Sequence, residues 1–457
     1  MASCLCDDCI IYGFAKRGFL MIRSIVLAIL LVPQDAATLK AGFAETDISP
    51  AAGTRKIGWN NKNYGTSVLD PLYAKAAVFE SGGAKVAFIS LDLLFVHRDQ
   101  VAEIRKRVQE KTGFPGDAIL IGATHNHAGP AIETDLYPKD EAYIASMIEK
   151  TVDAFIRAWE SRQEAEIGAA SVNEWNVAHN RRVLYRDGIV KCHGNFKDPN
   201  ALSFEGPVDP EVAVLAARTK EGKILGSIVN FACHPCHHGG DQVFSAGYPG
   251  QLAKVMKEKG SPVTLFLQGA GGNMHHADPS GVNKEKSMEE AGQALAADAE
   301  KAIQAMKFRA TAKLSARSRT IEVPYRKVTD EEVKGKVRGA QRFGEPGFYD
   351  KTQDMVLEEI QREGAAKAEV QAIRIDEIAY VAIPAEYFVQ HGLRIKQETH
   401  PLRTRVVGYA DGMLGYVPHK DAFKGGGYET TFGYRSKLAP EAGDMLADTA
   451  IELLKGK

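Results

Sequence analysis

Histidines gather in three short segments of this 457-residue chain, and the chemistry of the protein is expected to lie there. Seven of the 13 histidines fall in these segments: His125 and His127 in GATHNHAGP, His234, His237 and His238 in FACHPCHHGG, and His275 and His276 in GGNMHHAD. Each segment follows an apolar run that is typical of a β-strand. Neutral imidazole is the commonest protein ligand for zinc, and α/β proteins collect site residues at strand ends. The three segments together therefore predict a metal site.

A carboxylate is expected beside these histidines. A catalytic zinc site usually takes three protein ligands and keeps a position for a water, whose pKa falls to about 7. Two acids are placed to complete such a set: Asp92, which ends the strand in FISLDLL, and Glu386 in AIPAEYF, where an apolar strand gives way to a helix. The residues alone leave the choice between them open.

A glycine-rich turn, GAGGN (269–273), follows the apolar run VTLFLQ. Its backbone can approach a ligand closely and donate hydrogen bonds to a developing oxyanion, so Gly271, Gly272 and Asn273 are expected to bind substrate. The turn matches neither a phosphate-binding P-loop nor the dinucleotide fingerprint. The chain also has no GxSxG elbow and no catalytic cysteine signature, which argues against serine or cysteine acyl transfer.

Three cysteines follow residue 37, which are too few for a disulfide framework. Cys233 and Cys236 form a CxxC beside histidines, and Cys192 stands alone. The CxxC is expected to be either an inert pair of thiols or a local disulfide, with zinc ligation by sulfur as a third reading.

The alternation of apolar runs with amphipathic stretches predicts an α/β protein with a mixed β-sheet core flanked by helices. Expected strands are KVAFISLDLLFV (85–96), AILIGA (118–123), LGSIVNFACH (225–234), VTLFLQG (263–269) and IAYVAIPAE (378–386). Expected helices include residues 98–113, 140–161 and 286–306. No internal repeat is visible, and we expect a single large catalytic domain over residues 38–457. The charged segment 329–366 is expected to be a helical insertion or a cover over the core.

Residues 1–37 are expected to be an N-terminal extension followed by a signal peptide. Met21–Arg23 is a short positive segment, and the apolar stretch 24–32 after it is too short to span a bilayer as a helix. Small residues just before Thr38 supply a cleavage site, so the protein is expected to be secreted or periplasmic. A buried N-terminal helix is the alternative.

The charge balance argues against a polyanionic partner. The chain has 57 Lys and Arg residues against 58 Asp and Glu residues, a formal net charge of −1. No general electrostatic field would draw it to nucleic acid or to anionic lipid. We therefore expect no nucleic-acid partner and no membrane span in the mature chain.

A set of ordered motifs extends along nearly the whole mature chain. They are AGFAETDISP (41–50), ATHNHAGP (123–130), AHNRRVLYRDG (178–188), FACHP (231–235), SAGYPG (245–250), FLQGAGGN (266–273), IPAEYFVQHGLRIK (383–396) and GYVPHKDAFKGGGYE (415–429). The chain thereby resembles the catalytic domain of the neutral/alkaline, non-lysosomal ceramidases. ATHNHAGP is similar to that family's ATHTHSGP, and FLQGAGGN to its FxQxxxGN. Eight similarities in one order make coincidence improbable.

The resemblance implies a Zn²⁺ site. Carried over residue by residue, it gives His125, His234, Glu386 and Tyr416 as the metal ligands. It selects Glu386 over Asp92. Tyrosine is an unusual zinc ligand, so the assignment of Tyr416 rests on the resemblance alone.

The resemblance also implies roles for residues around the metal. His127 becomes a near-metal residue that positions water or transfers a proton, and Arg181 or Arg182 would face the substrate's oxygen. The family's serine in GNxSPN, which is implicated in ceramide hydrolysis, is replaced here by His275. This histidine can act instead as an acid or base beside the metal.

These predictions combine into one hypothesis, an exported zinc-dependent amidohydrolase that acts on linear amides. Its substrate would be a small-molecule or lipid-like N-acyl compound, because the family that it resembles acts in sphingolipid metabolism. One alternative is a non-catalytic lipid or carbohydrate binding protein on a degenerate ceramidase scaffold. The other is a metal-dependent esterase or phosphoesterase; a two-metal phosphoesterase predicts a bridging carboxylate such as Asp92 or Asp241.

Overall fold

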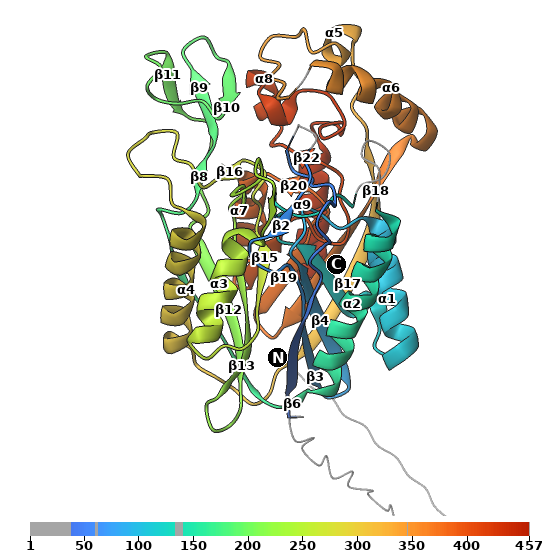
Figure 1. Ribbon diagram of the computed structural model, residues 1–457, viewed down its shortest axis with the longest axis vertical. Helices are drawn as coiled ribbons and strands as arrows, with labels where there is room; N and C mark the ends of the chain where they lie inside the picture. Colours follow the sequence, from blue (N-terminus) through green and yellow to red (C-terminus); the bar gives the residue numbers. More distant parts are fainter. Residues whose placement is uncertain (1–37, 60–62, 133–139, 345, 457) are drawn as a thin grey trace, which may run out of the picture. The chain divides into compact units, whose positions relative to one another are not determined.

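Three sheets with one shared plan carry the core of the protein (Figure 1). The computed structural model describes residues 38–456 except 60–62, 133–139 and 345, so the predicted signal peptide lies outside the described residues. The described residues belong to one large domain, and the predicted mixed α/β class is confirmed.

All three sheets share one strand order, to which the first sheet adds a fifth strand. The first sheet runs β5 (Ile119–Ala123), β4 (Ala84–Leu91), β3 (Tyr73–Ser81), β1 (Lys40–Asp47), β6 (Gln163–Glu164). The second runs β15 (Thr264–Gln268), β13 (Ile224–Phe231), β12 (Glu211–Arg218), β7 (Glu166–Asn173). The third runs β21 (Arg403–Val407), β19 (Ile378–Ala382), β18 (Ala365–Ile375), β17 (Leu314–Pro324). In each sheet the first pair is parallel and the other pairs are antiparallel.

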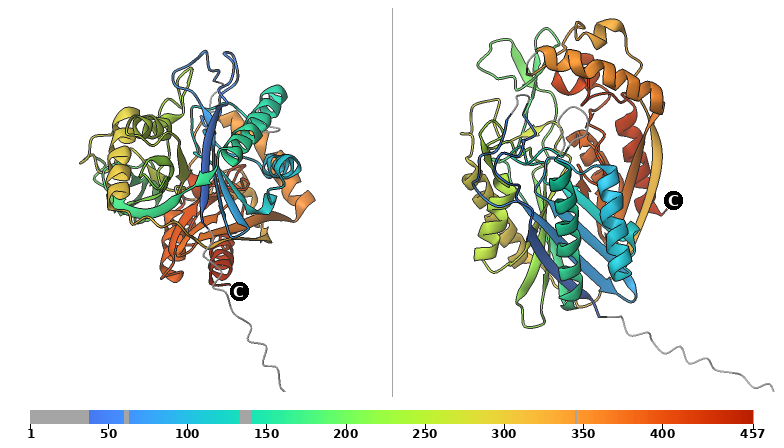
Figure 2. Two further views of the ribbon diagram at one scale, coloured as in Figure 1. Left: turned by 90° about the horizontal axis from the view of Figure 1, so that it is seen from below. Right: turned by 45° about the vertical axis from the view of Figure 1, so that its right-hand side comes forward.

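The helices follow the same plan three times. In each sheet a helix connects the two parallel strands: α1 (Arg98–Thr112), α3 (Gly247–Glu258) or α7 (Val389–Glu398). A second helix follows the edge strand: α2 (Glu141–Glu160), α4 (Met288–Ala305) or α9 (Ala442–Lys455). Seen from below, the α1–α2, α3–α4 and α7–α9 pairs lie around the sheets (Figure 2). The topology therefore repeats three times, although no repeat was expected from the sequence, because the units share a pattern of elements rather than of residues.

Local sequence explains both kinds of element. The helix α2 buries Ile144, Ile148, Val152 and Phe155, which recur at helical spacing, and the side chain of Asp140 accepts a hydrogen bond from the backbone of the first turn. The central strands are instead apolar on both faces, since each lies between a helix layer and a core that all three sheets share.

That shared core joins the three sheets. Phe88 of β4 packs edge-to-face on Tyr380 of β19, with ring centroids 4.8 Å apart. Polar contacts also cross between sheets: Ser90 Oγ donates to the Phe266 carbonyl at 2.6 Å, and Asn230 Nδ2 donates to the Val406 carbonyl at 3.0 Å. The sheets are thus held in a fixed relation at the level where their parallel strands end.

The remaining strands and helices named here lie beyond those strand ends. The strands are β2 (Ser67–Val68), β8 (His179–Asn180), β9 (Arg182–Tyr185), β10 (Val190–Cys192), β11 (Ala201–Phe204), β14 (Val243–Phe244), β16 (Met274–His275), β20 (Glu386–Tyr387) and β22 (Tyr416–Val417). The helices are α5 (Asp330–Val333), α6 (Pro346–Glu363), α8 (Ala422–Gly425) and the 3₁₀ turn η2 (Tyr428–Thr430). The segment 329–366 is helical over much of its length, as predicted. No helix in the described part of the chain has the length and apolar character needed to cross a membrane.

Candidate metal centre

His125 and His127 converge because the chain bends directly after β5. His125 has a φ of 63°, in the left-handed region, and the next amide, of Asn126, donates to the Leu93 carbonyl at 3.0 Å. The bend brings Nε2 of His125 to 3.2 Å from Nε2 of His127. The two imidazoles of the His-x-His turn therefore face one point.

The second and third sheets add His234 and Glu386 to this point. His234 follows β13, and Glu386 opens β20 just after β19. Glu386 Oε2 lies 3.4 Å from His125 Nε2 and 3.3 Å from His234 Nε2. One ligand atom from each of His125, His127 and His234 lies within 4.8 Å of the others. Each of the three sheets supplies part of the cluster.

Backbone carbonyls orient all three imidazoles. Nδ1 of His125, His127 and His234 hydrogen-bonds to the carbonyls of Leu94, Gly58 and Gly271, at 2.9, 2.8 and 2.7 Å. A carbonyl only accepts, so each Nδ1 carries the proton and each Nε2 presents a lone pair. Lone pairs that face each other at 3.2 Å repel unless a cation or a proton lies between them.

Burial disfavours the proton. It lowers the pKa of His234 to about 3 and holds the pKa of His127 well below the ordinary range, so both rings are neutral at pH 7. Burial alone would raise the pKa of Glu386, but its interactions with His125 and His234 outweigh that effect and keep the carboxylate ionised. His234 Nε2 and Glu386 Oε2 are fully buried without a hydrogen-bond partner among the described residues. Residues in this state fit a divalent metal ion.

Tyr416 lies next to Glu386 because β22 pairs in parallel with β20, with these two residues opposite each other. Its hydroxyl accepts a hydrogen bond from Arg181 Nη2 at 3.0 Å, and burial raises its pKa well above the usual value. Arg181 also donates to the Gly272 carbonyl and to Glu429, at 2.9 and 2.8 Å. The structure thus places Tyr416 and Arg181 beside the cluster, and their roles as ligand and catalytic residue stay predictions.

A cavity of about 720 Å³ opens onto the cluster. This volume is in the range of small-molecule sites. Predicted site residues in its lining are His125, His127, Arg181, His275, Glu386 and Tyr416. His275 Nδ1 accepts a hydrogen bond from the Ala277 amide at 2.9 Å, so Nε2 of the neutral ring carries a proton that it can donate.

The other predicted substrate residues do not line this cavity. The Gly272 amide donates to the Tyr387 carbonyl at 2.9 Å, and a Cβ on Gly272 would lie 2.4 Å from the Glu386 carbonyl oxygen. The side chain of Asn273 is bound to Val389 and Gln390. In the glycine-rich turn, Gly271 contributes the carbonyl that orients His234. The turn therefore supports the metal centre through backbone contacts. Direct substrate binding by the turn stays a prediction.

Arg182 is also turned away from the cavity. Its guanidinium is fully buried and pairs with Glu205 and Glu429. Its side chain therefore ties β9 to η2, and no contact supports its predicted substrate role. The neighbouring Arg181 shares Glu429 but reaches the cavity.

The alternative carboxylates lie elsewhere. Asp92 Oδ2 pairs with Lys75 at 3.1 Å and accepts from the Tyr73 amide at 2.9 Å. Asp241 pairs with His238 on the surface, at 2.7 Å. Neither belongs to the described His and Glu cluster, so the bridging carboxylate of a two-metal site has no support from these residues.

All three described cysteines, Cys192, Cys233 and Cys236, are free thiols. Of the readings left open for the CxxC, the structure shows the unbonded pair. Cys236 lines the cavity, and burial raises its pKa to about 12, so it is no ready nucleophile near neutral pH.

Several residues in or beside the cavity carried no signal in the sequence. His193 stands alone in the chain, yet it adopts a φ of 54° and sets its ring edge-on to His275, with centroids 4.7 Å apart. Tyr409 stacks on His125 at 4.0 Å. Trp59 adds an aromatic wall. Their positions depend on how distant segments pack, which spacing along the chain does not encode.

Together, the fold and the cluster define an α/β protein with a candidate metal centre at the junction of three sheets. The chain is related to the neutral ceramidases. An alignment of 232 residues with the neutral ceramidase of Pseudomonas aeruginosa shows 24% identity and covers 47% of this chain and 33% of that protein. An alignment of 287 residues with neutral ceramidase A of Dictyostelium discoideum shows 23% identity and covers 56% of this chain and 39% of that protein. No family model matches the sequence.

The solved structures agree in fold. The crystal structure of the Pseudomonas aeruginosa neutral ceramidase superimposes with a TM-score of 0.69 at 18% identity, over 92% of this chain and 75% of that chain. The present chain thus has a ceramidase-like hydrolase fold. In sequence, the chain aligns with well under half of the length of the two curated relatives.

Proposed function

We propose that this protein is an exported, zinc-dependent hydrolase of the neutral ceramidase type that cleaves a linear N-acyl amide. The convergence of His125, His234 and Glu386 on one buried point beside a cavity carries the proposal. A divalent cation held there, with Tyr416 as a further ligand, would polarise the substrate carbonyl and activate water. The relatives are named for ceramide, an N-acyl lipid, which supports this substrate class.

His127 is placed to move the proton. Its Nδ1 donates to the Gly58 carbonyl, so Nε2 accepts, and this atom faces the same point as His125 Nε2. Nε2 takes a proton as water adds to the amide carbon, and it gives that proton to the nitrogen as the C–N bond breaks. Water is consumed, and a carboxylic acid and an amine are released.

Replacing His127 by glutamine should separate proton transfer from metal binding. We expect zinc content to stay near the wild-type value while kcat falls by about 10²- to 10⁴-fold, the usual contribution of a general base. Metal analysis by mass spectrometry and steady-state kinetics measure the two effects. Loss of zinc in this variant would make His127 a ligand instead.

His275 has a more modest expected contribution, because its Nε2–H can donate only one hydrogen bond to substrate. We expect His275→Ala to lower kcat/KM by about tenfold, since a hydrogen bond contributes roughly 0.5–1.5 kcal/mol, and to leave zinc content unchanged. His276→Ala is the matched control, because that neighbouring ring is buried but does not line the cavity. Equal losses in the two variants would contradict the assignment.

The proposal as a whole is tested by metal analysis and a substrate panel. The chain from Thr38 should bind zinc and hydrolyse N-acyl amides, with activity lost on chelation and restored by zinc. Stable metal binding without turnover of amides, esters or phosphoesters would favour the non-catalytic alternative. Turnover of phosphoesters alone would favour a phosphoesterase, although Asp92 and Asp241 lie outside the cluster.

Export is proposed from the sequence of residues 21–37 alone. Expression of the complete chain followed by cell fractionation should place the protein outside the cytoplasm, with an N-terminus near Thr38. An uncleaved protein in the cytoplasmic fraction would contradict this part of the proposal.

A further inference from the structure

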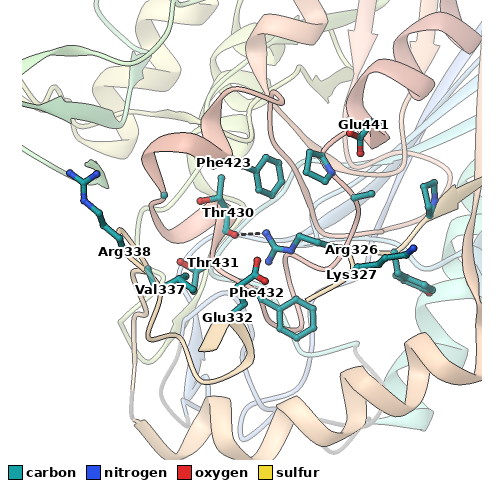
Figure 3. A pocket seen from close by; sticks show the side chains of 16 residues that line it. Arg326, Lys327, Glu332, Val337, Arg338, Phe423, Thr430, Thr431, Phe432 and Glu441 are labelled. Atoms are coloured by element: carbon teal, nitrogen blue, oxygen red, sulfur yellow. Dashed lines mark hydrogen bonds between the residues drawn. The ribbon is translucent and has the colours of Figure 1, made fainter. Parts of the chain in front are cut away.

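A second cavity, of about 580 Å³, shares no lining residue with the first. It lies between the end of β17, the segment around α5 and the chain that contains α8 and η2 (Figure 3). Three basic side chains, Arg326, Lys327 and Arg338, contribute to its lining. The cavity is large enough for a small organic ligand.

Arg326 is the central polar group of this cavity. Its guanidinium lies between the rings of Phe423 and Phe432, at 5.3 and 5.4 Å from their centroids. Nη1 donates to the Thr430 carbonyl at 2.8 Å, and Nε is buried without a partner among the described residues. A guanidinium has five N–H donors, so the protein satisfies this one only in part.

No described carboxylate lies within ion-pair distance of Arg326, whereas three other largely buried arginines are paired. Arg181 and Arg182 share Glu429, and Arg105 pairs with Glu369 and Asp411. Arg326 is partly buried, and this burial lowers its pKa although the nearby charge of Glu332 acts in the opposite direction. A partly buried cation without an ion-pair partner carries a desolvation cost, and an anion that reaches it recovers part of that free energy.

The acids in the cavity wall are engaged with other groups. Glu332 forms the capping box of α5 with Thr329. Glu441 pairs with Lys420 at 3.1 Å. Neither carboxylate is within ion-pair distance of Arg326, which leaves the guanidinium open to an external anion.

We propose that this cavity binds a small organic anion, whose carboxylate or phosphate pairs with Arg326 and whose apolar body packs against Phe423 and Phe432. A guanidinium suits both anions because its planar donors match two oxygens at once. Lys327 adds positive charge at the cavity wall, whereas the guanidinium of Arg338 points away from it. Since this cavity and the metal-site cavity have no lining residue in common, binding of the anion does not depend on the hydrolase activity.

Titration calorimetry with 4-bromobenzoate and with phenyl phosphate tests the proposal and distinguishes the two anions. Because carboxylates also bind metal centres, the measured quantity is the binding lost on Arg326→Gln. We expect at least a tenfold weaker Kd for the preferred anion in this variant, and no change in Arg342→Gln. Arg342 is a matched control: it stacks on Tyr349 and donates to the Val333 carbonyl, but it does not line the cavity.

A crystal of the wild-type protein with 4-bromobenzoate provides a readout that needs no variant. We expect the anomalous signal of bromine in the cavity, and neutral 4-bromobenzamide should not produce it. The proposal is overturned by equal affinity in wild type and Arg326→Gln, by equal binding of the neutral amide, or by no binding of either anion at millimolar concentration. If Arg326→Gln does not fold, Arg326→Lys and the bromine position decide.

Discussion

An alanine at position 234 is expected to release the metal and to lower kcat/KM by about a thousandfold or more. His234 is fully buried, and its Nε2 has no hydrogen-bond partner among the described residues, so its proposed purpose is metal ligation. A Lewis-acid metal contributes several kcal/mol to catalysis, and each 1.36 kcal/mol is a factor of about ten in rate. Metal analysis and kinetics on the same preparation measure both losses.

His238→Ala is the matched control for this experiment. It removes an imidazole from the same FACHPCHHGG segment, but His238 pairs with Asp241 on the surface and lies outside the cluster. We expect its zinc content and kcat/KM to stay within about twofold of the wild type. A His234→Ala protein that kept zinc and turnover would remove the proposed centre.

Glu429→Gln is expected to produce the largest loss of stability, about 3–5 kcal/mol in the free energy of unfolding. The carboxylate is fully buried and accepts from Arg181 at 2.8 Å and from Arg182 at 2.6 Å. A neutral amide would leave the buried guanidinium of Arg181 without a carboxylate partner and that of Arg182 with Glu205 alone. Urea unfolding, followed by circular dichroism, measures the difference.

Glu398→Gln is the control, since Glu398 forms an exposed pair with Arg394 one helical turn away. Surface pairs of this kind contribute about 0–1 kcal/mol. We therefore expect only a small change in the control. Similar losses in the two variants would show that the buried network does not depend on the charge of Glu429.

The same residue predicts a pH dependence. Burial alone would raise the pKa of Glu429, but Arg182 and Arg181 outweigh it and lower the pKa to about 2. The unfolded pKa is about 4.3, so the stabilisation is complete above that pH and is lost as the pH falls toward 2. The difference in unfolding free energy between wild type and Glu429→Gln should shrink over this interval, and a constant difference would contradict the charge-based account.

Much of the fold was predictable because the core strands are buried on both faces. Such strands read as continuous apolar runs, and the runs at 85–96, 225–234 and 378–386 overlap β4, β13 and β19, one strand of each sheet. The threefold plan was not predictable from the residues. Its units agree in the order and pairing of elements, while their side chains differ.

The candidate site, like the fold, was predictable only in part. Histidines after strands could be identified because they are rare residues in a position where α/β proteins concentrate function. Arg181 and Arg182, in contrast, are adjacent, identical in type and both paired with Glu429, and only the further pair with Glu205 marks Arg182 as the one held away from the cavity. These acids lie 23 and 247 residues from Arg182, a relation that exists only in the folded chain.

The threefold plan also sets an order of events during synthesis. The ribosome makes His125 first, His234 next and Glu386 last, each in a different unit of the fold. A nascent chain that ends after α4 already has both histidines but lacks the carboxylate and the sheet that holds it. A cation that needs all three ligands can therefore be captured only when the final third of the protein has emerged and packed, so metal loading would mark completion of the molecule.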